Sequence, residues 1–299
     1  MVVFLTSIRH PENAKDYGQI EKILKVTLGT VCGQTSDNFK VVVVCNQVPE
    51  NKYDDPRIEY HVVDFPPPAV GQNTSSLQFS ANSGDKACKL YSGLLYSKKY
   101  SPDYVYIFDA DDWIHKDIVK TLEESPKAKV WYVDKGYFVS YSEKEYKKKA
   151  GLTRYCGSTF AYDYEFILEQ GESSKHPQLT ENSSKEDLLN TLDEHYIYEI
   201  LGNHAKHYNY FKSMGITPQS FKFRAACWVL GTGENWSGES GKANGLPCDE
   251  QFCSDFNLPR NEFLNTQKPD FIMILKDLIG SFISEFKWFM SRVQKRNYF

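Results

Sequence analysis

Residues Tyr104–His115 read YVYIFDADDWIH, an apolar run that ends abruptly in acidic residues. The first five residues are typical of a buried strand, and three carboxylates follow, Asp109, Asp111 and Asp112. Mg²⁺ and Mn²⁺ prefer such hard oxygen ligands, and one or two carboxylates usually hold them together with substrate phosphates. The stretch therefore predicts a divalent-metal site whose partner is a diphosphate. The alternative is an acidic cap on a helix from Trp113 to Leu122.

Short apolar segments alternate with a helical pattern before this stretch. Strands are predicted at Val2–Leu5, Val41–Val44 and Ile58–Val63, and a helix at Tyr17–Cys32, where apolar residues recur at helical spacing. This alternation indicates a parallel sheet with helices on both faces and ligands at the carboxyl ends of the strands. The polar residues expected at that edge are Thr6, Arg9, Asn46 and Asp64.

A second helix is predicted from Asp85 to Lys98, after a polar loop at residues 71–84. Lys86 falls in the expected first turn, where the helix dipole disfavours a cation. The lysine therefore indicates either an anionic ligand or a solvated side chain, and both interpretations stay open.

The segments after the acidic stretch are less regular. Residues 130–133 and 136–141 are predicted strands, and the basic run Lys144–Arg154 is predicted as a solvated loop or, alternatively, a clamp for a phosphate or an acceptor. Residues 156–162, CGSTFAY, contain a glycine turn that suits close backbone approach to a ligand or tight packing. A strand at Phe221–Leu230 precedes a glycine-rich loop at residues 231–241 that lacks the P-loop pattern.

Lys185–Phe211 is predicted to be helical and is rich in titratable residues. Glu186 and Asp187 at its start are candidates for acid–base chemistry, although acids in a first turn also offset the helix dipole. His204 and His207 share a helix face, where packing is the commoner role and metal ligation the alternative.

The tail, Phe271–Phe299, has the pattern of an amphipathic helix with scattered lysines. Such a helix can dock on the rest of the chain, mediate dimerisation, or contact an anionic membrane surface. Docking is the commonest of the three.

The overall composition limits the class of protein. The chain has 299 residues, 41% hydrophobic and 25% charged, which suits a soluble protein with one large or two small domains. A net charge of −4 argues against a nucleic-acid partner. No signal peptide or membrane span is predicted, so we expect a cytoplasmic protein with peripheral membrane contact at most. Seven scattered cysteines without a CxxC pair indicate reduced thiols, with a Cys248–Cys253 bridge left open.

On these motifs, the first two thirds of the chain resemble the GT-A glycosyltransferases, family 2-like enzymes that use nucleotide-diphosphate sugars. Phe108–Asp112 is similar to their DxD motif, and the strand ends and the helix at Asp85 match in order. The resemblance implies an α/β fold, a Rossmann-like mixed sheet flanked by helices with a helical C-terminal extension. It divides the chain into a catalytic domain at 1–240, with a nucleotide-sugar half at about 1–125 and an acceptor half at about 126–240, and an extension at 241–299.

The resemblance also implies the site. Asp111 would hold Mn²⁺ or Mg²⁺, and Asp109 would contact the metal or the ribose. The donor would be a UDP or GDP sugar and the acceptor a saccharide or another hydroxyl compound. Family members usually carry an acid after the second strand, where this chain has Asn46, so the base stays open. The other residues implied to line the donor are Thr6, Arg9, Asn46, Lys86, Gly157, Ser158 and Asn235.

Inverting relatives place a catalytic base in a Glu-Asp pair downstream of DxD. Glu186-Asp187 matches this pair, with Asp187 as the expected base and Asp193 and Glu194 as the fallback. A retaining mechanism without such a base stays open.

Three other classes of protein compete with this interpretation. A haloacid-dehalogenase-like phosphatase also uses two strand-end aspartates, but it places them near the amino terminus. A nucleotidyltransferase shares the fold but generally has a glycine-rich basic loop after the first strand, whereas TSIRHPEN has one arginine and no glycine. A non-catalytic sugar-binding module of the same fold is the third alternative.

Overall fold

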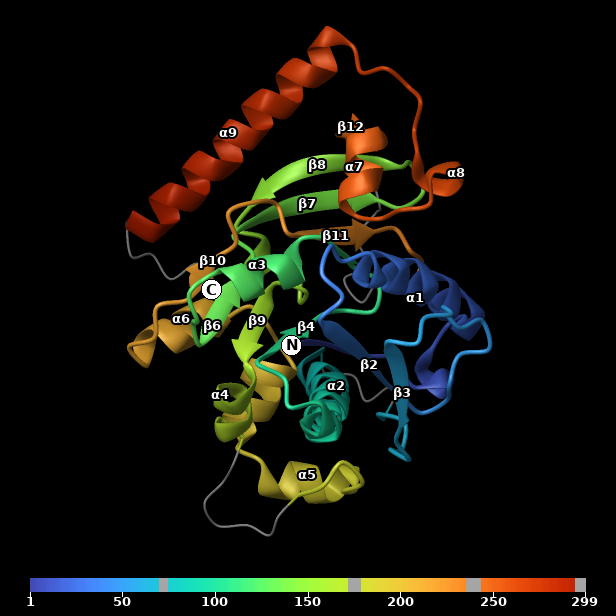
Figure 1. Cartoon of the computed structure of the whole chain (residues 1–299), viewed down its shortest axis with the longest axis vertical. Helices are drawn as coiled ribbons and strands as arrows, with labels where there is room; N and C mark the ends of the chain where they lie inside the picture. Colours follow the sequence, from blue (N-terminus) through green and yellow to red (C-terminus); the bar gives the residue numbers. More distant parts are fainter. Residues whose placement is uncertain (70–74, 172–178, 235–242, 294–299) are drawn as a thin grey trace.

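The structure is a computed structural model that describes residues 1–69, 75–171, 179–234 and 243–293. Its larger sheet has the strand order β10-β6-β9-β4-β1-β2-β3 (Figure 1). The amino-terminal part is parallel: β1 (Val2–Ser7) lies between β2 (Phe39–Cys45) and β4 (Tyr104–Ile107), and β3 (Ile58–Val62) follows β2. The predicted parallel α/β arrangement is confirmed for this part.

The sheet becomes mixed beyond β4. There β9 (Phe160–Asp163) runs antiparallel to both β4 and β6 (Val130–Tyr132), and β10 (Gln219–Ser220) pairs in parallel with β6. The turn before β9 is thereby placed beside the end of β4, where the acidic residues begin.

Helices cover both faces of this sheet. Side chains alternate between the faces of a strand, so Leu5 lies in a buried cluster with α2 (Ser75–Ser97). Its neighbour Phe4 lies in a second cluster with α1 (Tyr17–Cys32) and α3 (Ile118–Glu124). Burial on both faces explains why these strands are nearly continuous apolar runs.

A second, smaller sheet has the order β12-β8-β7-β11-β5. Trp113 is fully buried in its core, with its ring centroid 5.0 Å from that of Phe263. The elements of this region are β5 (Trp113–Ile114), β7 (Lys135–Ser140), β8 (Glu145–Ala150), β11 (Ala226–Leu230), β12 (Leu246–Pro247), α7 (Glu250–Asp255) and α8 (Arg260–Phe263).

The other helical elements lie around the two sheets, with α5 at the end of the molecule opposite α9 (Figure 1). They are η1 (Pro11–Asn13), η2 (Lys98–Tyr100), η3 (Leu152–Arg154), α4 (Tyr164–Glu169), α5 (Lys185–Thr191), the π-helix η4 (Tyr196–Leu201), α6 (His207–Ser213) and α9 (Phe271–Val293).

Several predicted elements are wrong in their bounds. Trp113 and Ile114 form a strand rather than the start of a helix, because they pair with β11. The basic run predicted as a loop contains β8, because its backbone pairs with β7 along its length. The helix predicted at 185–211 is divided into α5, η4 and α6, and Leu192, with extended backbone angles, ends the first piece.

Lys86 does not lie in a first turn, because α2 begins at Ser75 and not at Asp85. The argument from the helix dipole therefore does not apply to this lysine.

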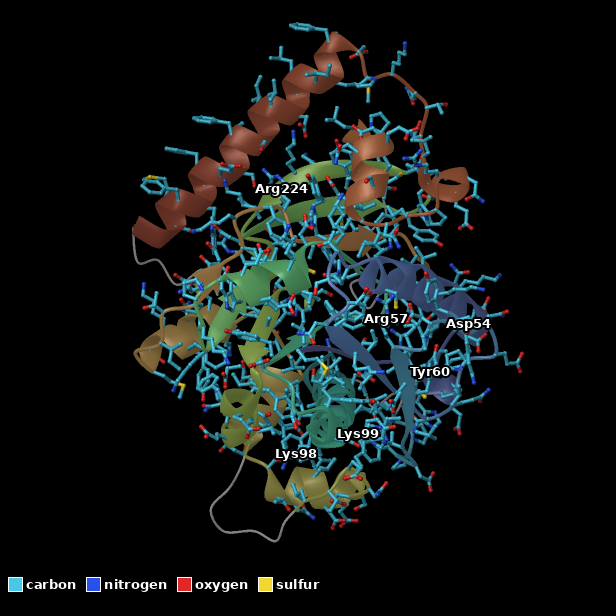
Figure 2. All side chains as sticks on the ribbon, viewed as in Figure 1. Asp54, Arg57, Tyr60, Lys98, Lys99 and Arg224 are labelled. Atoms are coloured by element: carbon cyan, nitrogen blue, oxygen red, sulfur yellow. The ribbon has the colours of Figure 1, made fainter. Side chains whose placement is uncertain are left out.

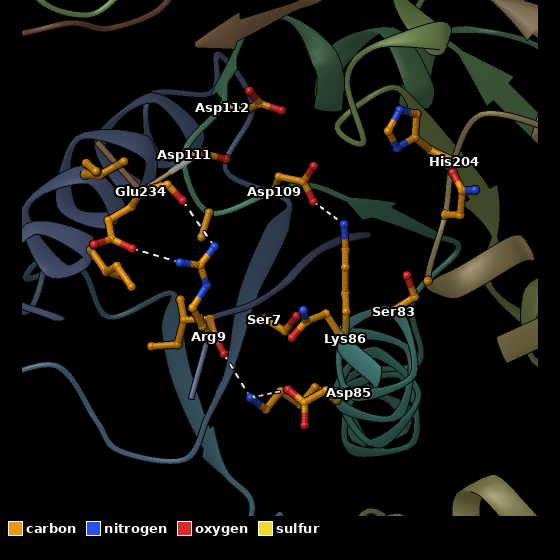
Figure 3. Close-up of a pocket in the computed structure, with 18 of the residues that line it drawn as sticks. Ser7, Arg9, Ser83, Asp85, Lys86, Asp109, Asp111, Asp112, His204 and Glu234 are labelled. Carbon is orange, nitrogen blue, oxygen red and sulfur yellow. Dashed lines mark hydrogen bonds and ion pairs between the residues drawn. The ribbon is translucent and has the colours of Figure 1, made fainter. Parts of the chain in front are cut away.

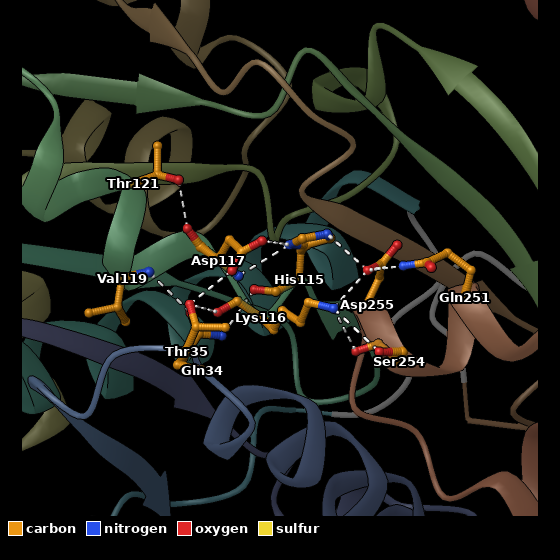
Figure 4. A network of polar contacts seen from close by, with 10 residues as sticks. All are labelled: Gln34, Thr35, His115, Lys116, Asp117, Val119, Thr121, Gln251, Ser254 and Asp255. Atoms are coloured by element: carbon orange, nitrogen blue, oxygen red, sulfur yellow. Dashed lines mark hydrogen bonds and ion pairs between the residues drawn. The ribbon is translucent and has the colours of Figure 1, made fainter.

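The boundary predicted at residue 240 does not separate two units. β12 pairs with β8, and Phe252 of α7 lies in the same cluster as Trp113. A polar network also joins α7 to the turn after β5, where the Lys116 ammonium lies 2.9 Å from an Asp255 carboxylate oxygen (Figure 4). Residues 243–264 thus belong to the fold of the second sheet.

Two further features concern membrane-spanning helices and disulfide bonds. None of the helices in the described ranges has the length and apolar character needed to cross a bilayer. All seven cysteines are free and buried, so Cys248 and Cys253 do not form a bridge.

Gly93 generates a prediction about stability. A Cβ atom at this position of α2 would lie 2.5 Å from a Leu5 methyl carbon and 2.6 Å from a Val44 methyl carbon. We expect Gly93→Ala to lower the free energy of unfolding by about 1–3 kcal/mol, because α2 would be pushed away from the sheet. Urea denaturation measures this change.

Gly280→Ala in α9 is the matched control, since its added Cβ would meet nothing closer than 3.8 Å. This variant should be as stable as the wild type or more stable, because alanine favours helix. Equal effects of the two substitutions would contradict the packing argument.

Candidate functional site

A pocket of about 350 Å³ opens at the carboxyl edge of β1 and β4 (Figure 3). This edge is where an α/β sheet normally binds ligands, and the volume lies within the range of small-molecule sites. Its main lining comes from residues 7–9 at the end of β1, from the part of α2 between residues 82 and 89, from residues 109–112 after β4 and from residues 202–204 after η4. Trp228 and Glu234 lie on the side of the second sheet.

Asp109 lies at the centre of the pocket and faces Lys86 (Figure 3). Its carboxylate forms an ion pair with the Lys86 ammonium, and its backbone amide donates to Ser158 Oγ at 2.8 Å. Burial alone would raise the pKa of this carboxyl, but Lys86 outweighs burial and holds the pKa below its ordinary value. A Cβ on Gly157 would lie 2.3 Å from Asp109 Oδ2, so glycine is required beside it.

Asp111 lines the same pocket. Burial and the nearby Asp109 carboxylate raise the pKa of Asp111 to about 7, despite opposing effects of Lys86 and Arg9. The two carboxylates therefore lie close enough to repel each other. A further cation between them would relieve that repulsion.

Asp112, the third acid of the stretch, has a structural position. It is 1% exposed, and its Oδ2 accepts from Ser158 Oγ at 2.7 Å and from Cys156 Sγ at 3.0 Å. Its Oδ1 accepts from the Val229 amide of β11 at 3.1 Å. Asp112 thus joins the turn after β4 to the turn before β9 and to the second sheet.

Arg9 lies at the opposite wall of the pocket from Lys86 (Figure 3). Its Nη1 is 2.8 Å from Glu234 Oε2, and its Nη2 donates to the Glu234 carbonyl oxygen at 3.1 Å. The other Glu234 carboxylate oxygen accepts from the Asp16 amide at 2.8 Å. The sequence did not single out Glu234, although it belongs to the predicted glycine-rich loop; Asn235, the next residue, lies outside the described residues.

Lys89 is a buried cation below the pocket that the sequence analysis also missed. It is 1% exposed, and its ammonium lies 2.9 Å from Asp85 Oδ2 and donates to the Ile8 carbonyl at 3.1 Å. Burial lowers the pKa of Lys89. Asp85 also pairs with Lys185 of α5 at 2.6 Å. The i,i+4 spacing of Asp85 and Lys89 was the available signal.

Four predicted donor residues do not line the pocket, namely Thr6, Asn46, Gly157 and Ser158. Gly157 and Ser158 lie against Asp109. Asn46 instead donates its side-chain amide to the Val63 and Phe65 carbonyls, at 3.1 and 2.9 Å, and so fixes the chain after β3. Thr6 is fully buried inside the sheet. Thr6 is the last residue but one of β1, so its side chain points to a covered face of the sheet.

Glu186 and Asp187 are exposed and do not line the pocket. Asp187 forms a capping box at the start of α5: its amide donates to Ser184 Oγ at 3.1 Å, and its Oδ2 accepts from the Ser184 amide at 3.3 Å. Of the fallback pair, Asp193 and Glu194 are also exposed, and Asp193 accepts from the Tyr196 amide at 3.0 Å. Asp187 and Asp193 thus accept from backbone amides at helix starts, and none of the four acids lines the pocket, so their positions do not support the predicted catalytic role.

The two histidines have different environments, and only His207 lies in a helix, because α6 begins at that residue. His204 lines the pocket, and burial, reinforced by Lys86 and opposed by Asp109, lowers its pKa to about 4. His207 is buried, with Nδ1 2.6 Å from the Tyr162 hydroxyl. Across the described ranges, no three His, Cys, Asp or Glu side chains are grouped so as to hold a metal ion by themselves.

His207 generates a prediction about pH. Burial, with His204 adding to it, lowers the pKa of His207 from 6.5 to about 3. Between these values the unfolded chain binds a proton that the folded chain does not, so stability falls as the pH falls through this window. We expect His207→Phe to reduce that loss by about 1.4 kcal/mol per pH unit. Urea denaturation at several pH values between 4 and 7 measures the slope, and an unchanged slope would contradict the assignment.

Comparisons of the sequence with protein-family models and with curated proteins gave no match. The arrangement of the pocket is therefore the basis for a functional assignment. Its described lining combines two neighbouring carboxylates, Asp109 and Asp111, with the cations Lys86 and Arg9.

Proposed function

We propose that this protein is a GT-A type glycosyltransferase, which moves a sugar from a nucleotide-diphosphate sugar to an acceptor hydroxyl with a divalent metal at Asp109 and Asp111. The observation that carries the proposal is the position of these two carboxylates. They follow a buried parallel strand and line one pocket together with Lys86 and Arg9. This combination suits a metal diphosphate, because the carboxylates can bind the metal cation and the lysine and arginine can bind the phosphate oxygens.

The architecture supports the same proposal. The first four strands of the larger sheet are parallel, and β9 then inserts antiparallel beside β4. A Rossmann-like mixed sheet of this kind is the fold that the DxD resemblance implied. The insertion also brings Gly157 and Ser158 against Asp109, as expected for residues beside the donor.

The residues present fit Mn²⁺ or Mg²⁺. Asp109 and Asp111 offer hard oxygen donors, and Gly157 leaves the space that the Asp109 carboxylate occupies. Two carboxylates suffice where substrate phosphates complete the coordination. Bound there, the metal would supply charge neutralisation for the leaving nucleoside diphosphate.

The chain's own cations have defined roles in this proposal. Lys86 pairs with Asp109 and lines the pocket, so its ammonium would neutralise a phosphate bound with a metal at that carboxylate. Glu234 orients the Arg9 guanidinium through two contacts and leaves it at the pocket wall. Both cations stabilise negative charge that develops on the leaving group.

His204 is the proton acceptor that we assign in place of Asp187. Three pocket carboxylates, Asp85, Asp109 and Glu234, are already held in ion pairs. His204 lines the pocket, and burial lowers its pKa, so its imidazole is neutral at pH 7. A neutral imidazole can take the proton of an attacking hydroxyl group.

Loss of Asp111 should abolish metal-dependent binding. We expect the wild type to bind UDP or GDP only with Mn²⁺ or Mg²⁺, and Asp111→Ala to weaken this binding by about a hundredfold or more, because a metal ligand is lost. Isothermal titration calorimetry with and without EDTA measures it. Asp54 is exposed and does not line the pocket, so it provides the control Asp54→Ala, which should bind normally (Figure 2). Metal-independent binding, or no nucleotide binding by the wild type, would refute the proposal.

A second measurement distinguishes His204 from Asp187 as the catalytic base. We expect His204→Gln to slow hydrolysis of the preferred nucleotide sugar by about a hundredfold while nucleotide affinity stays unchanged. Asp187→Asn should leave the rate unaltered, because Asp187 caps α5 outside the pocket. A screen of nucleotide sugars for slow hydrolysis provides the assay without knowledge of the acceptor. The opposite pattern of rates would restore Asp187 as the base.

A further inference from the structure

α9 is attached to the rest of the molecule by its polar face. Asp277 pairs with Lys148 of β8 at 2.8 Å, and Glu285 pairs with Lys135 at 2.8 Å and with Arg224 at 3.1 Å. These contacts fix the helix along the second sheet, on the side away from α1 (Figure 1).

Trp288 adds an aromatic anchor to the same face. It is 6% exposed, its indole nitrogen donates to Asp134, and the Arg154 guanidinium lies 4.6 Å from the ring centroid. A Cβ on Gly151 would lie 2.8 Å from a Trp288 ring carbon, so the helix packs closely here. α9 is therefore docked in a defined orientation.

The opposite face of α9 is apolar and exposed. Phe271, Phe282 and Phe289 are 76%, 71% and 60% exposed, and Leu278 and Phe286 are more than half exposed. These residues recur at intervals of three, four and seven, so they form one stripe along the helix. The side chains along the outer edge of α9 project away from the other elements (Figure 2).

This arrangement reverses the usual amphipathic helix, whose apolar face packs on the core. Exposing a continuous row of large apolar side chains is unfavourable in water, because each would gain roughly 1.5–3 kcal/mol on burial. Large exposed apolar patches mark interaction surfaces. The face consequently requires a partner.

The charges along the helix identify the kind of partner. Both acids of α9, Asp277 and Glu285, are paired with cations of the sheet. Lys276 and Lys287 are exposed about three turns apart, on one side of the helix, with no ion pair within the described part of the chain. The exposed Lys147 of β8 lies alongside, with its Cε 3.8 Å from the position of a Cβ on Gly280.

We propose that the outer face of α9 binds an anionic lipid surface, with the helix lying in the plane of the membrane interface. The apolar stripe would enter the boundary between headgroups and acyl chains, and the lysines would contact anionic headgroups. A second copy of the chain is the less suitable occupant, because a twofold contact would set the same lysine-bordered stripe against itself.

Vesicle co-sedimentation of the whole chain tests this proposal. We expect binding to vesicles of phosphatidylcholine with phosphatidylserine, weaker binding to phosphatidylcholine alone, and weaker binding at high salt. Phe282→Ser with Phe286→Ser should lower the partition coefficient at least about tenfold. Lys276→Glu with Lys287→Glu should remove the preference for anionic vesicles. Thermal unfolding checks that each variant is folded.

Met214→Ser is the matched control, because Met214 is 45% exposed and lies outside α9. Its binding should equal that of the wild type. If the phenylalanine substitutions leave vesicle binding unchanged, the proposal is overturned. Sedimentation velocity tests the alternative occupant, a second copy of the chain. If the wild type is a dimer that does not bind vesicles, and Phe282→Ser with Phe286→Ser dissociates this dimer, the proposal is overturned and the face is a dimer interface. None of these measurements uses a nucleotide or metal, so their outcome is independent of the proposed transferase activity.

Discussion

The buried carboxyl group of Asp112 joins the segments from which the pocket is built. One of its oxygens accepts from Ser158 and Cys156 in the turn before β9, and the other accepts from the Val229 amide in the second sheet. Ser158 in turn accepts from the Asp109 amide. Each of these groups is buried or partly buried, and an unpaired buried polar group costs about 1–3 kcal/mol. The position of Asp109 in the pocket therefore depends on contacts that Asp112 and Ser158 make with both sheets.

A second set of charges fixes the floor of the pocket. Lys89 is buried and held by Asp85 and the Ile8 carbonyl, while Asp85 also binds Lys185 of α5. Burying such ions has an unfavourable desolvation free energy. Their mutual attraction and hydrogen bonds offset it only when every partner is present. The contact explains why the beginning of α5 lies close to α2. Asp187, two residues after Lys185, caps α5 outside the pocket lining.

The C-terminal helix α9 packs on the fold in a different way from the other α-helices. The other described α-helices bury apolar residues in one of three clusters. α9 uses ion pairs and one tryptophan to attach to the second sheet, and it leaves its apolar stripe exposed. Because Arg154, which stacks on Trp288, is followed by Tyr155 of the pocket lining, the helix and the pocket share a connecting segment.

Local patterns in the sequence determined much of this protein. The apolar strands, the helix at Tyr17–Cys32, the acidic end of β4 and the amphipathic character of α9 all follow from side-chain periodicity, which reports burial over a few residues. Only the tertiary structure decided which acid is structural, that Glu234 approaches Arg9 from 225 residues away, and that α9 presents its polar face to the sheet. Those outcomes depend on hydrogen bonds and ion pairs between segments distant in the chain. No local pattern encodes such contacts, because they form only when the fold brings their partners together.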